Sequence, residues 1–180
     1  MPIYDDSNIF ARILRGEIPC HKVHEDDDLI AFMDVMPQAE GHVLVVPKKA
    51  SRNLRDADPS VFGPAVTMVQ KLGNAAMRAF GADGFRLVQF NEAPAGQTVF
   101  HLHFHMIPAY GGVPLRGHSG QMEDKAVLVA NAEKLKAALE KSKTKGILSQ
   151  VAYLAAIPIA FWKPNISMLL FAAVAVAWIV

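Results

Sequence analysis

Gly96-Gln97-Thr98-Val99-Phe100-His101-Leu102-His103-Phe104-His105-Met106-Ile107-Pro108 places three histidines at every second position. Successive side chains of an extended strand point to opposite faces of a sheet. We therefore expect a strand over Val99 to Ile107, with the three histidines on one face and apolar residues packing between them. Each imidazole brings two polar nitrogens that need partners, and its pKa near neutrality suits proton transfer, anion contact or nucleophilic attack. The stretch therefore predicts both a strand of the sheet and the active site.

Two other interpretations of these histidines stay open. Single histidines in strands are usually structural residues whose nitrogens are satisfied by neighbouring groups. Two histidines spaced by one residue on a strand also chelate zinc, with a third ligand from elsewhere in the chain. The spacing alone does not separate phosphate chemistry from a metal site.

Further short apolar segments surround the histidine stretch. They predict strands over Leu29 to Val35, His42 to Val46 and Phe85 to Phe90, separated by turns that contain proline or glycine.

Two segments carry helical spacing. Asp58 caps a predicted helix that runs to Phe80, and Gly81 ends it. A second helix is expected over Val127 to Leu139. Strands before and after one central helix favour an α+β domain built on an antiparallel sheet.

The histidine stretch resembles the signature of the histidine triad (HIT) superfamily of nucleotide hydrolases and transferases, His-φ-His-φ-His-φ-φ with φ an apolar residue. Similar segments continue over residues 3 to 140; they are Asn8 to Pro19, Glu25 to Asp28, Ala31 to Val35, Pro37 to Lys48 and Phe85 to Glu92. The resemblance implies the HIT-like fold, an antiparallel sheet with a central and a C-terminal helix. It also implies a homodimer whose sheet continues across the two subunits.

The same resemblance implies a set of catalytic residues. His103, the middle histidine, would attack the α-phosphorus of a nucleotide derivative and form a nucleotidyl-histidine intermediate. His105 and His42 would contact the phosphate oxygens, and His101 would help to orient the nucleophile. We expect further phosphate contacts or loop ordering from Asn91, Gly96, Gln97 and Thr98, with the Gln97 amide and the Thr98 hydroxyl as donors.

The nucleoside half of the site follows from the resemblance as well. Asp34 stands where the family holds the ribose hydroxyls, and Phe10, Ile18 and Phe32 match positions that enclose the base. Each also has a plain structural interpretation, because the three apolar residues would suit a core and Asp34 a turn.

Two departures from the family pattern affect the expected ligands. The Cys-x-x-Cys pair that holds structural zinc in many bacterial relatives is replaced by Ile9 to Arg12, and Cys20 lies too far along to substitute for it. We therefore predict no metal and no organic cofactor. Ala109 follows Ile107-Pro108 where relatives often carry arginine, which bears on the choice of substrate.

The C-terminal residues form a second predicted region, and we expect domains over residues 1–141 and 142–180. After Lys141 the chain contains two apolar runs, residues 147–162 and 166–180, which predict a hydrophobic helical hairpin associated with a membrane. The preceding lysines would keep the catalytic domain cytoplasmic, attached to the inner membrane. The alternative is a tail that packs on the domain or on a dimer partner.

Composition excludes several classes of protein. A formal net charge of +1 gives no case for nucleic-acid binding, which favours a basic stripe. The single cysteine, Cys20, excludes an internal disulfide framework, and we expect no secretory signal because residues 1–6 are short and partly acidic.

The sequence therefore predicts an enzyme that acts at an α-phosphate, with a purine nucleotide derivative as its substrate. Nucleoside phosphoramidates, adenylated adducts and dinucleoside polyphosphates are the candidates. Two alternatives are a non-catalytic nucleotide sensor tethered to a membrane and a zinc-dependent hydrolase that uses the three histidines.

Overall fold

The computed structural model describes residues 3–117, 121–162, 168–169 and 172–175. The chain divides into two compact units, Met1–Ala138 and Leu139–Val180. The first unit contains the sheet and all the residues predicted for the site. The predicted boundary after residue 141 stays a prediction.

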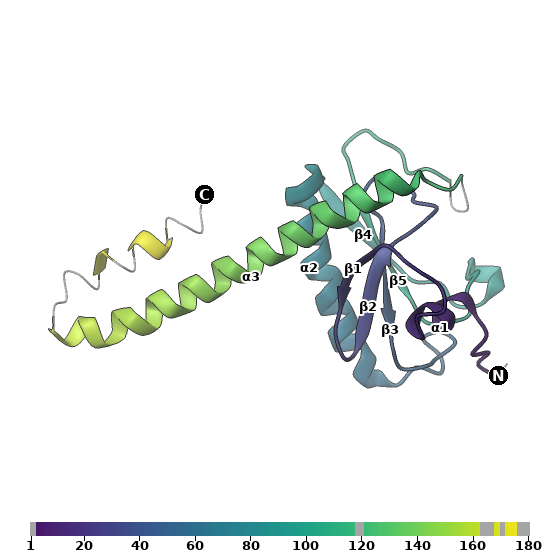
Figure 1. Ribbon diagram of the computed structural model, residues 1–180, viewed down its shortest axis with the longest axis horizontal. Helices are drawn as coiled ribbons and strands as arrows, with labels where there is room; N and C mark the ends of the chain where they lie inside the picture. Colours follow the sequence, from purple (N-terminus) through teal and green to yellow (C-terminus); the bar gives the residue numbers. More distant parts are fainter. Residues whose placement is uncertain (1–2, 118–120, 163–167, 170–171, 176–180) are drawn as a thin grey trace. The chain divides into compact units, whose positions relative to one another are not determined.

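A five-stranded antiparallel sheet forms the centre of the first unit (Figure 1). Its strands lie in the order β1-β2-β3-β5-β4. They are β1 (Lys22–Glu25), β2 (Leu29–Met33), β3 (Val43–Pro47), β4 (Gly84–Val88) and β5 (Phe104–Ala109). All residues of β2 and β3 are buried, as expected for apolar segments in the middle of a sheet covered on both faces. The α+β fold with an antiparallel sheet is confirmed.

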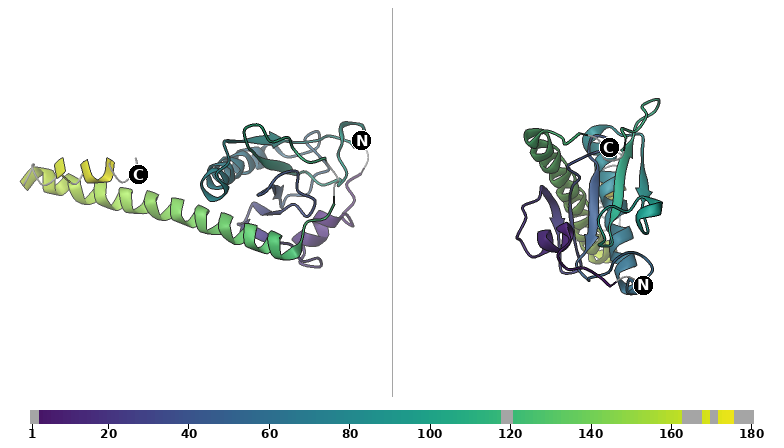
Figure 2. Two further views of the ribbon diagram at one scale, coloured as in Figure 1. Left: turned by 90° about the horizontal axis from the view of Figure 1, so that it is seen from above. Right: turned by 90° about the vertical axis from the view of Figure 1, so that its right-hand side faces the viewer.

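Helix α2 (Phe62–Phe80) packs against β3, β4 and β5 on one face of this sheet (Figure 2). A short 3-10 turn, η1 (Pro59–Val61), precedes it, and the Asp58 side chain accepts a hydrogen bond from the Ser60 N–H there. Gly81 ends α2 in the left-handed conformation with φ of 66°, which glycine adopts without steric cost. The predicted stop of this helix at Gly81 is found, whereas Asp58 caps η1 and α2 itself begins after Val61, which makes no side-chain capping hydrogen bond.

The opposite face of the sheet carries helix α1 (Ile9–Leu14) and the candidate site. Phe10 of α1 packs with the alternate residues of β2 and β3, in a cluster made of Phe10, Ile30, Phe32, Leu44 and Val46. His105 lies opposite Leu44 in the β3–β5 pairing, so its side chain points to the same face. Asp34 and His42 are each two residues from a member of this cluster along nearly extended chain, which directs them to the same face.

The predicted strand over Val99 to Ile107 is wrong in its first half. β5 begins only at Phe104, so His101 and His103 precede the strand, and the Leu102 N–H donates to the Ser51 carbonyl instead of a sheet neighbour. This loop-like approach turns His101 away from the face that holds His103 and His105. The alternation of histidine and apolar residues therefore begins before the strand does.

Helix α3 (Lys125–Trp162) begins near the start of the predicted helix and continues through its predicted end at Leu139. The intervening residues 140–146 contain no proline that would stop it. The first predicted apolar run therefore belongs to α3, and the residues that the structure describes do not show the predicted hairpin. Most of the second run, residues 166–180, lies outside the described residues.

Within the part of the chain that the structure describes, no helix is long and apolar enough to cross a membrane. The predicted membrane attachment through residues 147–180 stays a prediction.

Candidate active site

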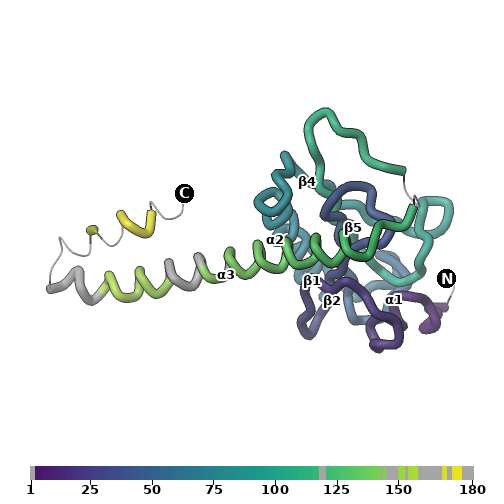
Figure 3. Tube along the Cα trace, turned by 45° about the horizontal axis from the view of Figure 1, so that its top comes forward, coloured from purple at the N-terminus to yellow at the C-terminus, as the bar shows by residue number. Residues whose placement is uncertain are grey.

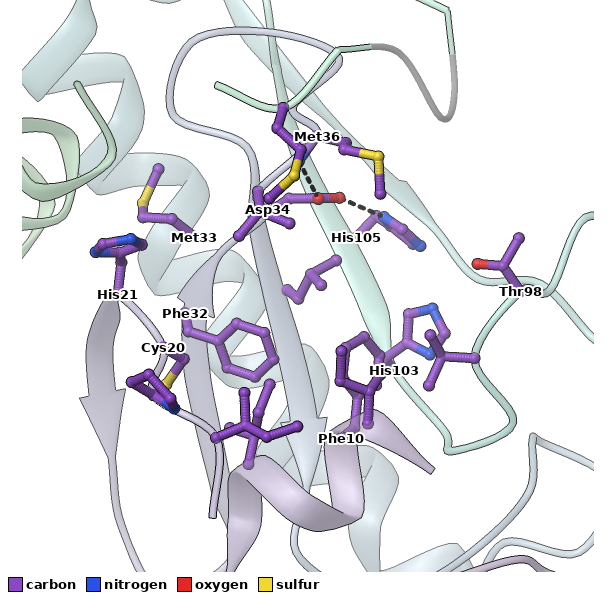
Figure 4. Close-up of a pocket in the computed structure, with 18 residues that line it drawn as sticks. Phe10, Cys20, His21, Phe32, Met33, Asp34, Met36, Thr98, His103 and His105 are labelled. Atoms are coloured by element: carbon purple, nitrogen blue, oxygen red, sulfur yellow. Dashed lines mark hydrogen bonds and ion pairs between the residues drawn. The ribbon is translucent and has the colours of Figure 1, made fainter. Parts of the chain in front are cut away.

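A cavity of about 410 Å³ opens on the α1 face of the sheet (Figure 4). This volume lies within the roughly 300–1,000 Å³ range of small-molecule sites. Seven of the predicted site residues line it; they are Phe10, Ile18, Phe32, Asp34, Thr98, His103 and His105. The other five, His42, Asn91, Gly96, Gln97 and His101, are not among its lining residues.

His103 stands at the cavity with its ring orientation fixed by the backbone. Its Nδ1 lies 2.6 Å from the carbonyl oxygen of His101, and a carbonyl only accepts, so this nitrogen carries the proton. In the neutral ring, Nε2 then holds the lone pair that a nucleophile needs. Phe10 contacts the same ring edge to face, with the centroids 5.0 Å apart. The tautomer here follows from the hydrogen-bond network.

His105 and His42 form a second hydrogen-bonded chain beside His103. The Gln38 N–H donates to Nδ1 of His42 at 3.1 Å, so Nε2 of His42 carries the proton in the neutral ring. That Nε2–H lies 3.0 Å from Nδ1 of His105 and donates to it. The proton of neutral His105 is thereby assigned to Nε2, which makes Nε2 the hydrogen-bond donor of this ring. The centroids of the His105 and His103 rings lie 5.0 Å apart.

Asp34 borders the same group from the end of β2. Its Oδ1 accepts a hydrogen bond from the Met36 N–H at 2.9 Å. Its Oδ2 lies 3.5 Å from Nδ1 of His42 and 4.0 Å from Nδ1 of His105, as the dashed lines in Figure 4 indicate for His105. The Asp34 side chain is only 13% exposed, yet it lines the cavity. Its carboxylate can therefore accept hydrogen bonds from hydroxyl groups of a ligand there.

The potential metal ligands Asp34, His42 and His105 have donor atoms within 4.8 Å of one another. The hydrogen bonds of the two rings do not suit coordination, however. Gln38 N–H is directed at Nδ1 of His42, and the other nitrogen of His42 carries a proton directed at His105. Coordination through Nδ1 of His42 would displace the Gln38 N–H group, and coordination through Nε2 would displace the proton directed at His105. His101 also points elsewhere, so the three histidines of the triad do not converge on one ion.

The apolar end of the cavity lies beneath α1. Phe10 and Phe32 meet edge to face with centroids 5.6 Å apart, and Ile18 adds a third apolar wall. Cys20 and His21 also line this end, next to Phe32 in Figure 4. Burial raises the pKa of the Cys20 thiol, which stays protonated and apolar in character. Sequence reasoning did not place either residue at the site, although they lie two and three positions after the predicted Ile18.

The loop between β4 and β5 is held by a network that the sequence did not reveal. Gln97 is 2% exposed, and its amide donates to the carbonyl oxygens of Arg52 and Val99 at 2.7 and 3.0 Å. Its oxygen accepts from the Glu92 N–H and the Asn53 amide at 2.8 and 3.2 Å. The predicted phosphate contact by Gln97 would break one of these bonds, so the structure gives this residue the role of holding the loop.

Arg52 and Glu92 complete this network. The guanidinium of Arg52 donates to both carboxylate oxygens of Glu92 at 2.8 to 3.2 Å. Its Cζ atom also lies 3.8 Å from the centroid of the Phe100 ring, in a cation–π contact. The hydrogen bonds from Arg52 and then Asn53 lower the pKa of Glu92 to about 2. Glu92 adopts φ of 70°, a left-handed conformation that costs about 1–3 kcal/mol in a residue with a side chain. The Arg52 pair holds the loop in this conformation.

The remaining loop residues divide between structure and cavity. Asn91 accepts a hydrogen bond from the Leu54 N–H and donates one to the Gln89 side chain. It therefore helps to order the loop, which is one of the two roles predicted for it. Gly96 adopts φ of 99°. Thr98 is exposed at the cavity, where its hydroxyl is accessible to a ligand.

His101 is 1% exposed and faces away from the cavity. Its Nε2 lies 2.9 Å from the Pro47 carbonyl oxygen and its Nδ1 lies 2.6 Å from the Tyr4 hydroxyl. Burial lowers the pKa of His101, and the hydrogen bond to Pro47 opposes that shift. His101 therefore contacts the site through its backbone carbonyl, which accepts the hydrogen bond from Nδ1 of His103.

The family comparison covers most of this site. The HIT domain family matches residues 15–112, which include all three histidines of the triad. The adenylylsulfatase HINT3 of Arabidopsis thaliana is 37% identical over 124 residues, 66% of this chain and 63% of that protein, so the match spans less than two thirds of that relative. An uncharacterized HIT-like protein of a Synechocystis strain is 44% identical over 109 residues, 61% of this chain and 93% of its own length.

Solved structures give the same result for the fold. A HIT-like protein involved in cell-cycle regulation from Bartonella henselae is 52% identical with a TM-score of 0.73, covering 76% of this chain and 99% of that one. A zinc-bound histidine triad family protein from Mycobacterium smegmatis is 29% identical with a TM-score of 0.69, covering 77% of this chain and 96% of that one.

Proposed function

The chain belongs to the HIT domain family, and we propose that it is a nucleotide hydrolase or transferase that forms a covalent nucleotidyl intermediate on His103. Nucleotide binding is the general property that the family supports. The proposal extends it to catalysis and to named residues.

One observation carries the catalytic proposal. The hydrogen bond from Nδ1 of His103 to the His101 carbonyl assigns the lone pair of the neutral ring to Nε2, in a residue that lines the cavity. A protein that only binds nucleotides needs no imidazole held in the nucleophilic tautomer. This observation favours an enzyme over the sensor alternative.

In the proposed first step, Nε2 of His103 attacks the α-phosphorus, and the bond from phosphorus to the leaving group breaks. The leaving group departs with the electron pair of that bond and takes a proton from solvent or from the site. In the second step, a water molecule or another acceptor attacks the same phosphorus, loses its proton and releases the histidine. Splitting one difficult displacement into two is the general benefit of covalent catalysis.

Charge develops on the phosphate oxygens in both steps, and two groups are positioned to stabilise it. The Nε2–H of His105 is assigned as a donor by the chain through His42, and the Thr98 hydroxyl lies at the cavity. His42 acts through His105 because its own ring is fully buried.

We propose that the nucleoside lies against the apolar end of the cavity. A purine would fit between Phe10, Ile18 and Phe32, and the ribose hydroxyls would donate to Asp34. A carboxylate acceptor matches a diol donor chemically. The proposed substrates are nucleoside phosphoramidates, adenylated adducts and dinucleoside polyphosphates, and the name of the Arabidopsis relative adds adenylyl sulfate to those worth testing.

The central experiment measures hydrolysis of an adenosine phosphoramidate and of adenylyl sulfate by the full chain, with and without a chelator. We expect turnover that survives chelation and that His103→Ala abolishes. Mass spectrometry of the rapidly quenched enzyme should show one added adenylyl group, which the variant lacks. His24→Ala is the matched control, since His24 lies outside the cavity and pairs with Asp26.

Turnover that persists in His103→Ala would overturn the assignment of the nucleophile. Tight nucleotide binding without turnover on any of the substrates would favour the sensor, and loss of activity to the chelator would favour the zinc-dependent hydrolase.

We also propose a homodimer, which the resemblance to the family implies. Analytical ultracentrifugation of the full chain should give the mass of two chains, and a mass of one chain would contradict this part of the proposal.

A further inference from the structure

The N-terminal segment places a tyrosine hydroxyl on the first histidine of the triad. The Tyr4 oxygen lies 2.6 Å from Nδ1 of His101, and the two rings meet edge to face with centroids 5.6 Å apart. The two residues are 97 positions apart in the sequence. Tyr4 is not among the residues that line the cavity, so it has no direct contact with a ligand there.

The direction of this hydrogen bond follows from the other side of the ring. Nε2 of His101 lies 2.9 Å from the Pro47 carbonyl oxygen, which only accepts, so Nε2 carries the proton. Nδ1 of the neutral ring is then an acceptor, and the Tyr4 hydroxyl donates to it. Burial raises the pKa of Tyr4, which keeps the hydroxyl protonated and able to donate. Both ring nitrogens of His101 are thereby fixed in one tautomer.

His101 in turn holds His103 through the main chain. Its carbonyl oxygen accepts the hydrogen bond from Nδ1 of His103 at 2.6 Å. A rotation of His101 would shift this carbonyl because the residue lies outside the regular ladder of β5. The position of the His101 ring and the tautomer of His103 are therefore coupled through a single residue.

The segment that carries Tyr4 is itself ordered by local hydrogen bonds. The Asp5 carboxylate accepts from the N–H and hydroxyl of Ser7, and the Asn8 side chain caps α1 by accepting from Phe10 and Ala11. Phe10 then contacts the His103 ring. Figure 3 shows this segment, in purple, leading directly into α1. Residues 4–10 therefore contact both His101 and His103.

We propose that Tyr4 is a positioning residue for catalysis: its hydroxyl and the Pro47 carbonyl together hold the His101 ring in place, and this supports the hydrogen bond that keeps His103 in its nucleophilic form. This inference rests on the proposed function, since it assigns Tyr4 a part in the reaction at His103. Tyr4 acts through His101 and does not touch the substrate. A tyrosine with a purely structural role would contribute to folding stability without affecting the hydrogen bond of His103.

The first test compares Tyr4→Phe with the full-length wild type, using an adenosine phosphoramidate as the substrate. Loss of one hydrogen bond to a buried nitrogen should lower kcat about tenfold. KM should stay nearly constant, because the cavity walls are unchanged. Tyr110→Phe is the matched control, since the Tyr110 hydroxyl makes only a 3.4 Å hydrogen bond to the Glu40 carbonyl, which is a surface contact.

A double variant tests the route of the effect. In a His101→Ala background, Tyr4→Phe should cause no further loss of kcat, because its target is gone. An equal loss in both backgrounds, an equal loss in Tyr110→Phe, or a change confined to KM would overturn the proposal.

Nitrogen-15 NMR of the histidine rings separates this inference from the proposed function. In the wild type, Nδ1 of His101 should give the chemical shift of a hydrogen-bond acceptor, and the Nδ1–H proton of His103 should exchange slowly with water. Tyr4→Phe should move the Nδ1 signal of His101 and broaden the Nδ1–H signal of His103. If the wild type hydrolyses none of the substrates, the proposed function fails while the NMR comparison still tests the coupling. Unchanged histidine spectra in Tyr4→Phe would overturn the inference whatever the activity.

Discussion

Replacing Gln97 with leucine tests whether this residue holds the loop or contacts phosphate. The amide makes four hydrogen bonds inside the protein, to the carbonyls of Arg52 and Val99, the Glu92 N–H and the Asn53 side chain. Leucine has a similar size but no polar atoms, so all four bonds are lost together.

The expected loss of stability can be worked from these contacts. Four hydrogen bonds at about 1 kcal/mol each contribute roughly 4 kcal/mol. A buried leucine side chain offsets about 1–2 kcal/mol of this through the hydrophobic effect. We therefore expect Gln97→Leu to lower the free energy of unfolding by about 2–3 kcal/mol, and the melting temperature by roughly 5–10 °C.

Urea denaturation followed by circular dichroism measures this change, with Gln70→Leu as the control because Gln70 is exposed on α2. The control should change the free energy of unfolding by less than about 0.5 kcal/mol. A Gln97→Leu variant as stable as the control, with a raised KM for nucleotide, would refute the structural role and restore the predicted phosphate contact.

Three further changes should have distinct effects. Phe10→Ala removes the edge-to-face contact with His103 and should destabilise the protein by about 3–4 kcal/mol in urea titrations, with weaker nucleotide binding in calorimetry. Glu92 has its pKa lowered to about 2 from an ordinary 4.5, so its pairing stabilises the fold above pH 4.5 and is lost as the pH falls toward 2. Unfolding midpoints of Glu92→Gln should therefore depend less on pH across that window than those of the wild type. Gly41→Ala should destabilise the protein in thermal melts, because φ is 80° and the new Cβ would lie 2.6 Å from the Phe80 ring; an unchanged melting temperature would show that Phe80 moves aside.

Local patterns in the sequence predicted those helices and strands whose position depends on neighbouring residues alone. Asp58 caps η1 just before α2, and Gly81 ends α2, because a cap and a left-handed stop are made by nearest neighbours. The apolar runs of β2 and β3 were predictable because both faces of these strands are buried. The extent of α3 was not, since a change of composition near residue 142 is no barrier to helix propagation.

The site shows the same division between sequence and tertiary structure. The alternating histidines indicated the family by themselves, because three histidines in that spacing are rare. Only the tertiary structure shows that the His101 ring points away from the cavity and toward Tyr4. It also shows that the Gln97 amide forms its hydrogen bonds with Arg52, Val99, Glu92 and Asn53. These partners lie up to 97 residues away in sequence, and a hydrogen bond between such distant groups leaves no trace in local spacing. The sequence thus determined which chemical groups the site contains, while tertiary structure determined which nitrogen of each histidine carries its proton.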